Sequence, residues 1–136
     1  MIVIIIIGVL ATVGIMQYQG AIEKARGAEA RQVLGQSRTQ CTAIFMSEGS
    51  TAGCTNAAMR IGSEIPGPAA CADTHWFRYA SVASGVDTSV RIFTANRCTA
   101  ATGGGKSPTG PAIVGSLALF TDYDSGTDIW NNTGGY

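Results

Sequence analysis

The first 22 residues of the chain are apolar on almost every side, and no charged residue precedes Glu23. The β-branched run Ile2–Ile7 leaves a helix without any polar face. As a helix, this segment spans roughly 33 Å, enough to cross the hydrocarbon core of a bilayer. Gly8 and Gly14 do not forbid a helix in lipid. The pattern predicts a membrane-spanning or subunit-packing helix over residues 1–22.

Two other interpretations of this segment fit the pattern less well. A signal peptide has a charged start, a shorter apolar core and a small-residue cleavage site, whereas this apolar run passes directly into a helical pattern. A buried core helix with no polar face needs burial on all sides. A chain of 136 residues offers little protein to surround it.

Residues 23–49 continue the helix with a single apolar face. Apolar and small residues recur there at spacings of three and four. They are Ala30, Val33, Leu34, Ser37, Cys41, Ile44 and Phe45. Glu23 and Arg26 can pair one turn apart, and Gly49 is a plausible helix stop. We expect one helix from Met1 to about Glu48, whose second half docks on a sheet or on sister subunits.

The rest of the chain, residues 50–136, predicts a small head with β-structure. Three segments alternate as strands do, and a short fourth follows them. These are residues 76–82, 89–95, 116–121 and 128–131. Six aromatic residues in them are expected in the core: Trp76, Phe77, Tyr79, Phe93, Phe120 and Trp130. The sequence therefore predicts an α+β fold, with the long helix on an antiparallel meander of three to four strands.

Four cysteines lie in the second half of the helix and in the head, at Cys41, Cys54, Cys71 and Cys98. Their spacings match no C-x-x-C metal or redox motif, so two disulfides and an oxidising compartment are the simplest interpretation. Three connectivities are possible. We favour Cys41–Cys54 with Cys71–Cys98, because the first pins the following loop to the helix end and the second ties that loop to a strand. Free buried thiols are the alternative.

The low share of charged residues disfavours several classes of function. Only 13% of residues are charged and the net charge is zero, against about 25% charged in a typical soluble domain. A basic nucleic-acid binder and a disordered charged tail are therefore disfavoured. The single histidine, His75, has no partner in a recognisable nucleophile motif. We expect no catalytic residue, no cofactor and no enzyme activity.

One acidic stretch has the oxygen spacing of a calcium loop: Asp122, Asp124 and Asp128 around Gly126. The closing glutamate of that motif is missing. A hairpin turn that uses Asp-Ser-Gly is the preferred interpretation, and calcium is the alternative.

The run Met1–Ala11, followed by Tyr18-Gln19, closely resembles the N-terminal helix of type IV pilins and pseudopilins. This resemblance implies a lollipop-shaped subunit that is inserted in the inner membrane before assembly. Pilus machinery would then polymerise it into a filament on a bacterial cell surface. Copies of the chain would pack through their helices, and small residues allow close approach. The residues assigned to these contacts are Ile4, Ile7, Gly8, Ala11, Gly14, Ile15 and Tyr18.

The resemblance leaves two alternatives open: a pseudopilin of a type II secretion system, and a membrane-anchored periplasmic binding domain that never polymerises. The family's leader peptide, its cleavage and methylation site and its acidic residue would precede Met1. Met16 stands where many pilins have a kink-forming proline. Gly8 and Gly14 bracket the stretch that unwinds in assembled pili, and each costs about 1 kcal/mol of helix propensity. We expect local melting there.

Overall fold

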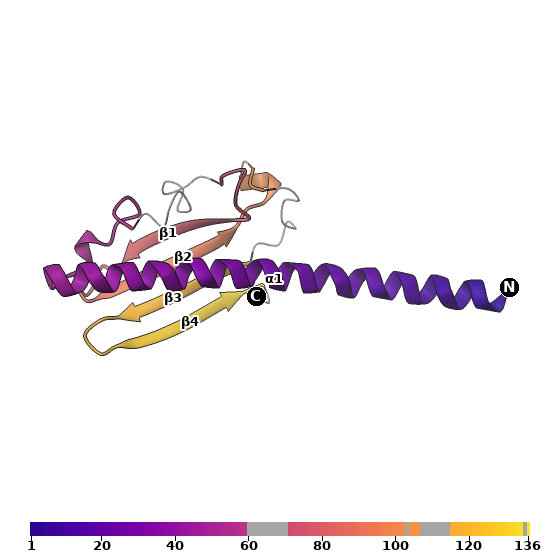
Figure 1. Ribbon diagram of the computed structural model, residues 1–136, viewed down its shortest axis with the longest axis horizontal. Helices are drawn as coiled ribbons and strands as arrows, with labels where there is room; N and C mark the ends of the chain where they lie inside the picture. Colours follow the sequence, from indigo (N-terminus) through magenta and orange to yellow (C-terminus); the bar gives the residue numbers. More distant parts are fainter. Residues whose placement is uncertain (60–70, 103, 107–114, 135) are drawn as a thin grey trace.

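The computed structural model describes residues 1–59, 71–102, 104–106, 115–134 and 136 of the chain. One long helix, α1 (Ile2–Glu48), lies across a four-stranded antiparallel sheet, and its N-terminal half projects beyond the sheet (Figure 1). This is the α+β arrangement that the hydrophobic pattern predicts.

Helix α1 ends where the sequence indicates. Gly49 adopts the left-handed conformation with φ 67°, and its N–H donates to the carbonyl oxygen of Phe45 at 2.7 Å. Glycine takes this backbone conformation without steric cost, so it closes the last turn. The helix is unbroken through Gly8 and Gly14 in this single chain. Local melting in an assembled state therefore stays a prediction.

The sheet is a meander whose strands follow in chain order: β1 (Phe77–Ala83), β2 (Val90–Arg97), β3 (Ser116–Asp122) and β4 (Thr127–Thr133). Two short 3-10 helices, η1 (Thr51–Gly53) and η2 (Ala100–Thr102), follow α1 and β2. All four expected strands are present, with bounds that differ by at most two residues. Burial alternates along β2 and β3, as it does when one face packs on a helix and the other is more open.

The core lies between the second half of α1 and the inner face of β1, β2 and β3. Buried helix residues from Gly27 to Cys41 meet buried strand residues from the sheet. The strand residues are Phe77, Tyr79, Phe93, Ala95, Leu117 and Leu119. Ile44 packs against this cluster with part of its surface exposed. The predicted apolar face of residues 23–49 is thus the docking face of the helix.

The expectation that all six strand aromatics belong to the core is wrong for two of them. Trp130 is 48% exposed, because β4 is an edge strand and α1 packs mainly on β2 and β3. Phe120 alternates with the buried Leu119 and Thr121, so it lies on the face of the sheet turned away from α1. Periodicity identified these strands but did not show which part of the sheet the helix would cover.

Candidate functional site

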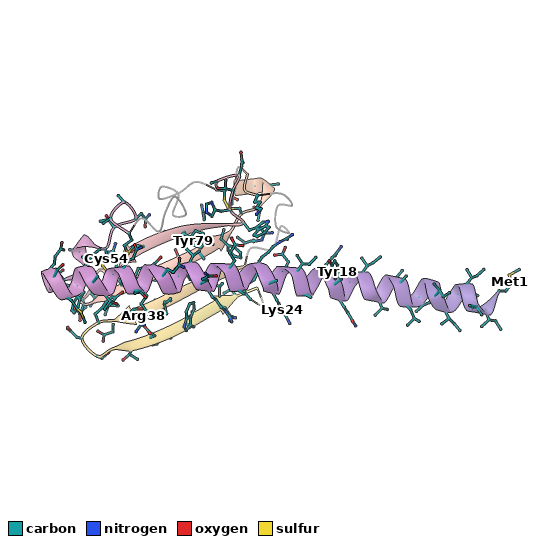
Figure 2. All side chains as sticks on the ribbon, viewed as in Figure 1. Met1, Tyr18, Lys24, Arg38, Cys54 and Tyr79 are labelled. Atoms are coloured by element: carbon teal, nitrogen blue, oxygen red, sulfur yellow. A yellow bond between two sulfur atoms is a disulfide. The ribbon has the colours of Figure 1, made fainter. Side chains whose placement is uncertain are left out.

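The largest exposed apolar surface among the described residues is the N-terminal half of α1, residues 1–21, which we call the projecting half. All of residues 1–21 are exposed, and Ile4 is 75% exposed although it is strongly apolar. Soluble monomers rarely expose apolar patches of this extent, and larger ones mark interaction surfaces. Figure 2 shows side chains radiating from every side of the helix between Met1 and Tyr18, with no part of the head beside them. The apolar side chains of this half are therefore exposed in the single chain and need lipid or another protein to cover them.

By length and composition, α1 is able to cross a membrane. Its most apolar window has a mean hydropathy of 2.1 and is entirely exposed. The Thr12 hydroxyl donates to the Val9 carbonyl oxygen at 2.8 Å, so this polar group is satisfied within the helix. A long apolar N-terminal helix of this kind is typical of a membrane anchor or a signal.

The residues expected to make helix–helix contacts all lie in this projecting half. Ile4, Ile7, Ile15 and Tyr18 are all more than half exposed, and the small residues between them are exposed too. An added Cβ at Gly8 or Gly14 would meet no atom of another described part of the chain within 4 Å. Neither glycine is therefore required by packing within the subunit.

The helix enters the head through an ionic junction at Glu23. Its carboxylate accepts hydrogen bonds from Nε and Nη2 of Arg97, both at 3.2 Å, and also pairs with Arg26. Arg97 lies on β2 and is only 1% exposed. It also donates to the carbonyl oxygen of Trp76 at 2.9 Å. A nearly buried guanidinium needs such a partner, because burying an unpaired charge is costly.

The charges at this junction shift the ionisation of Glu23. Burial alone would raise the pKa of its carboxyl, but the hydrogen bonds and charges of Arg97 and Arg26 hold that pKa below its ordinary value of 4.5. The spacing of Glu23 and Arg26 predicted their pair. No local signal pointed to Arg97, which lies 74 positions away in the sequence.

A second contact fixes the same end of the head on the helix. The ring of Tyr136 lies against Gly27 and Gly115 and packs edge-on against Phe77 at 5.4 Å between ring centroids. A Cβ at Gly27 would lie only 2.8 Å from Cδ1 of Tyr136, so the glycine makes room for the ring. Arg31 Nη2 donates to the main-chain oxygen of Tyr136 at 2.7 Å. Burial, with the nearby Glu23 carboxylate, raises the pKa of Tyr136. No pattern in the sequence indicates this contact.

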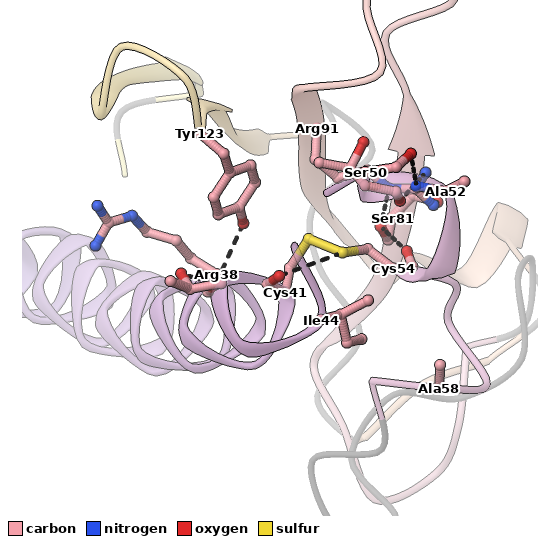
Figure 3. The surroundings of a disulfide bond; sticks show 12 residues. Arg38, Cys41, Ile44, Ser50, Ala52, Cys54, Ala58, Ser81, Arg91 and Tyr123 are labelled. Atoms are coloured by element: carbon pink, nitrogen blue, oxygen red, sulfur yellow. Dashed lines mark hydrogen bonds between the residues drawn. A yellow bond between two sulfur atoms is a disulfide. The ribbon is translucent and has the colours of Figure 1, made fainter. Parts of the chain in front are cut away.

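The first disulfide lies at the other end of the docked half. Cys41 on α1 is bonded to Cys54 after η1, with 5.3 Å between the Cα atoms (Figure 3). Tyr123 reaches the helix beside it and donates to the Arg38 carbonyl oxygen at 3.2 Å. Burial raises the pKa of Tyr123 to about 12, with smaller and opposing effects of Arg38 and Asp128.

The second disulfide joins Cys71 to Cys98, with 5.8 Å between the Cα atoms. It connects the segment before β1 to the residue after β2. Both bonds follow the pairing favoured from the sequence, and no cysteine among the described residues is free. The Pro-containing part of the loop between Cys54 and Cys71, residues 60–70, lies outside the described residues.

Two of the three calcium candidates, Asp122 and Asp128, have other partners for their carboxylates. Asp122 Oδ1 accepts the main-chain N–H groups of Asp124 and Ser125, at 3.0 and 3.4 Å, and Oδ2 accepts the Ser125 hydroxyl at 2.7 Å. Asp128 pairs with Arg38 at 2.9 Å. Among the described residues, no group of three His, Cys, Asp or Glu side chains is arranged to hold a metal ion. The contacts of Asp122 are those of a hairpin turn, which is the interpretation that the sequence favours.

No protein family, curated protein or solved structure matches the chain. Its function must therefore be inferred from its own residues and their arrangement.

Proposed function

We propose that this chain is the structural subunit of a type IV pilus-like surface filament and that it polymerises through the projecting half of α1. The observation that carries the proposal is the complete exposure of this apolar half beyond a folded head. Fully burying one large aliphatic side chain contributes about 1.5–3 kcal/mol. Residues 1–22 therefore strongly favour an apolar environment, first lipid and then the helices of neighbouring copies.

The way the head is attached supports this role. Contacts at Glu23, Gly27 and Cys41 hold the second half of α1 along the sheet. The projecting half and the head then move together, as a subunit must if packing in the filament core is to position its head at the surface. Disulfides are stable in the oxidising compartments where a surface filament resides.

Small residues in the projecting half support packing against other helices. In lipid the hydrophobic effect does not drive helices together, so close van der Waals contact between them matters more. Gly8, Ala11 and Gly14 lie on this half and are exposed, and a Cβ added at either glycine would meet no described residue of another part of the chain within 4 Å. We propose that they allow neighbouring helices to approach closely, next to Ile4, Ile7, Ile15 and Tyr18.

The experiment expresses the chain, with a pilin leader supplied, in a bacterium that has pilus assembly machinery. Filaments are sheared from the cells and examined by electron microscopy, and the chain is traced in the sheared and membrane fractions. Ala11→Leu and Gly14→Leu keep the segment apolar but block close helix approach. Ile5→Leu is the matched control, because it keeps side-chain size.

We expect the parent chain and Ile5→Leu in sheared filaments, and Ala11→Leu and Gly14→Leu only in the membrane fraction. A chain that never leaves the membrane fraction, whatever its sequence, contradicts the proposal and favours the non-polymerising anchored domain. A chain that supports type II secretion but forms no sheared filament favours the pseudopilin.

A further inference from the structure

A pocket of about 250 Å³ lies at the end of the head farthest from the N-terminus, between η1 and the turn that joins β1 to β2. Its walls are largely apolar, and they include Ala52, Ala83 and Val86. Thr51 fastens the two sides, because its N–H and its hydroxyl both donate to the Thr88 carbonyl oxygen at 2.8 Å. The pocket is therefore part of a braced region of the fold.

Arg91 of β2 also lines this pocket, and it is only 5% exposed. Its Nε donates to the Ser81 hydroxyl at 2.7 Å (Figure 3). Its two terminal nitrogens donate to the carbonyl oxygens of Ser81 and Thr51, both at 3.3 Å. A guanidinium carries five N–H groups. Two of those of Arg91 therefore have no acceptor among the described residues.

Arg91 also has no carboxylate partner within the described part of the chain. All three of its acceptors are neutral, whereas the other buried arginine of β2, Arg97, pairs with Glu23. Buried charges in proteins are normally paired. Asp87 lines the pocket as well, but it is exposed and its Oδ1 accepts the Ser89 N–H at 3.0 Å. Among the described residues, the guanidinium that lines this pocket thus has no carboxylate paired with it.

We propose that this pocket binds a small monocarboxylate, which accepts the two remaining N–H groups of Arg91 and places a short apolar tail against Ala52, Ala83 and Val86. The planar guanidinium fork matches a carboxylate in a bidentate arrangement. A phosphate dianion fits less well, because it needs more donors and would meet the charge of Asp87. The carboxylate comes either from a free molecule or from a side chain of a neighbouring copy.

The test uses the full chain in detergent micelles and follows the arginine Nε–H resonances by NMR at constant ionic strength. Butyrate is the probe, acetate tests the contribution of the tail, and chloride and inorganic phosphate are the anion controls. Ala52→Glu places a carboxylate at the pocket without altering Arg91. Arg91→Lys assigns the resonance, and Arg78→Lys, on the face of the sheet turned away from α1, is the matched control.

We expect a saturable shift of the Arg91 resonance with butyrate, a several-fold weaker response to acetate, and no saturable response to chloride or phosphate. Arg78→Lys should respond like the parent chain, and Ala52→Glu should lower the affinity for butyrate about tenfold or more. A shift that is unsaturable, that chloride or phosphate reproduces, or that is unchanged in Ala52→Glu overturns the proposal.

A dilution series of the chain without butyrate separates the two sources of the carboxylate. A concentration-dependent shift of the Arg91 resonance indicates a side chain of a second copy, and a concentration-independent spectrum indicates a free molecule. Both results support a carboxylate site when the butyrate response is present. Neither depends on whether the chain forms filaments.

Discussion

Replacing Glu23 with glutamine tests the junction between the helix and the head. The change keeps the size and one oxygen acceptor but removes the negative charge that faces Arg97, which is 1% exposed. Removing one partner of a fully buried ion pair costs about 3–5 kcal/mol. Glu23 is partly exposed, and Arg97 keeps the carbonyl oxygens of Trp76 and Cys98 as acceptors. We therefore expect a smaller loss, about 2 kcal/mol.

The assay is urea unfolding of the disulfide-intact chain in micelles, with Glu29→Gln as the control. Glu29 lies on the same helix, and no ion pair ties it to the head among the described residues. That variant should change the free energy of unfolding by less than about 0.5 kcal/mol.

The pH dependence supplies a second test of the same junction. The pKa of Glu23 is lowered in the folded state, so its contribution is present above the ordinary pKa of 4.5 and is lost as the pH falls through the folded value. The difference between the parent chain and Glu23→Gln should therefore shrink in acid. Equal stability of Glu23→Gln and Glu29→Gln at neutral pH, or a difference that does not change with pH, would refute the reasoning.

Three further predictions concern contacts between α1 and the head. Gly27→Ala should destabilise the fold by about 1–3 kcal/mol, because the new methyl group collides with the Tyr136 ring; Tyr136→Ala in the same chain should remove most of this penalty in a double-mutant cycle. Replacing Cys41 and Cys54 together with serine should lower the free energy of unfolding by about 3 kcal/mol, and an unchanged urea midpoint would contradict this. Absorbance titration should show an ionisation at about pH 12 that is lost in Tyr123→Phe. Because the folded state holds the Tyr123 phenol neutral, the free energy of unfolding should fall between about pH 10 and pH 12.

The parts of the fold that follow from local patterns were predictable. The apolar run before Glu23, the periodic face from Ala30 to Cys41 and the glycine at position 49 fixed the helix and its end, because helix periodicity and capping are local properties. The four strands followed in the same way. The disulfide pairing was one of three possibilities. The favoured pairing ties the loop after the helix to the helix end through Cys54 and to a strand through Cys98.

The parts that depend on distant contacts were not predictable. Trp130 was expected in the core, but its exposure depends on which strands α1 covers, and the strand pattern does not contain that information. Arg97 reads as an ordinary strand residue until the fold brings it to Glu23. The space for the Tyr136 ring depends on Gly27 and Gly115, which are far apart in the sequence. Taken alone, each glycine indicates only a turn or an irregularity in the helix. That no carboxylate among the described residues pairs with Arg91 likewise appears only in three dimensions.

The central claim is that the projecting half of α1 packs against copies of itself in a filament. The most direct measurement is a cryo-electron microscopy reconstruction of filaments sheared from cells that express the chain. We predict helical density for residues 1–22 in the filament core, with Gly8, Ala11 and Gly14 at helix–helix contacts and the disulfide-bonded heads at the surface. A chain that is found only in membranes, or filaments whose core excludes residues 1–22, would contradict the account.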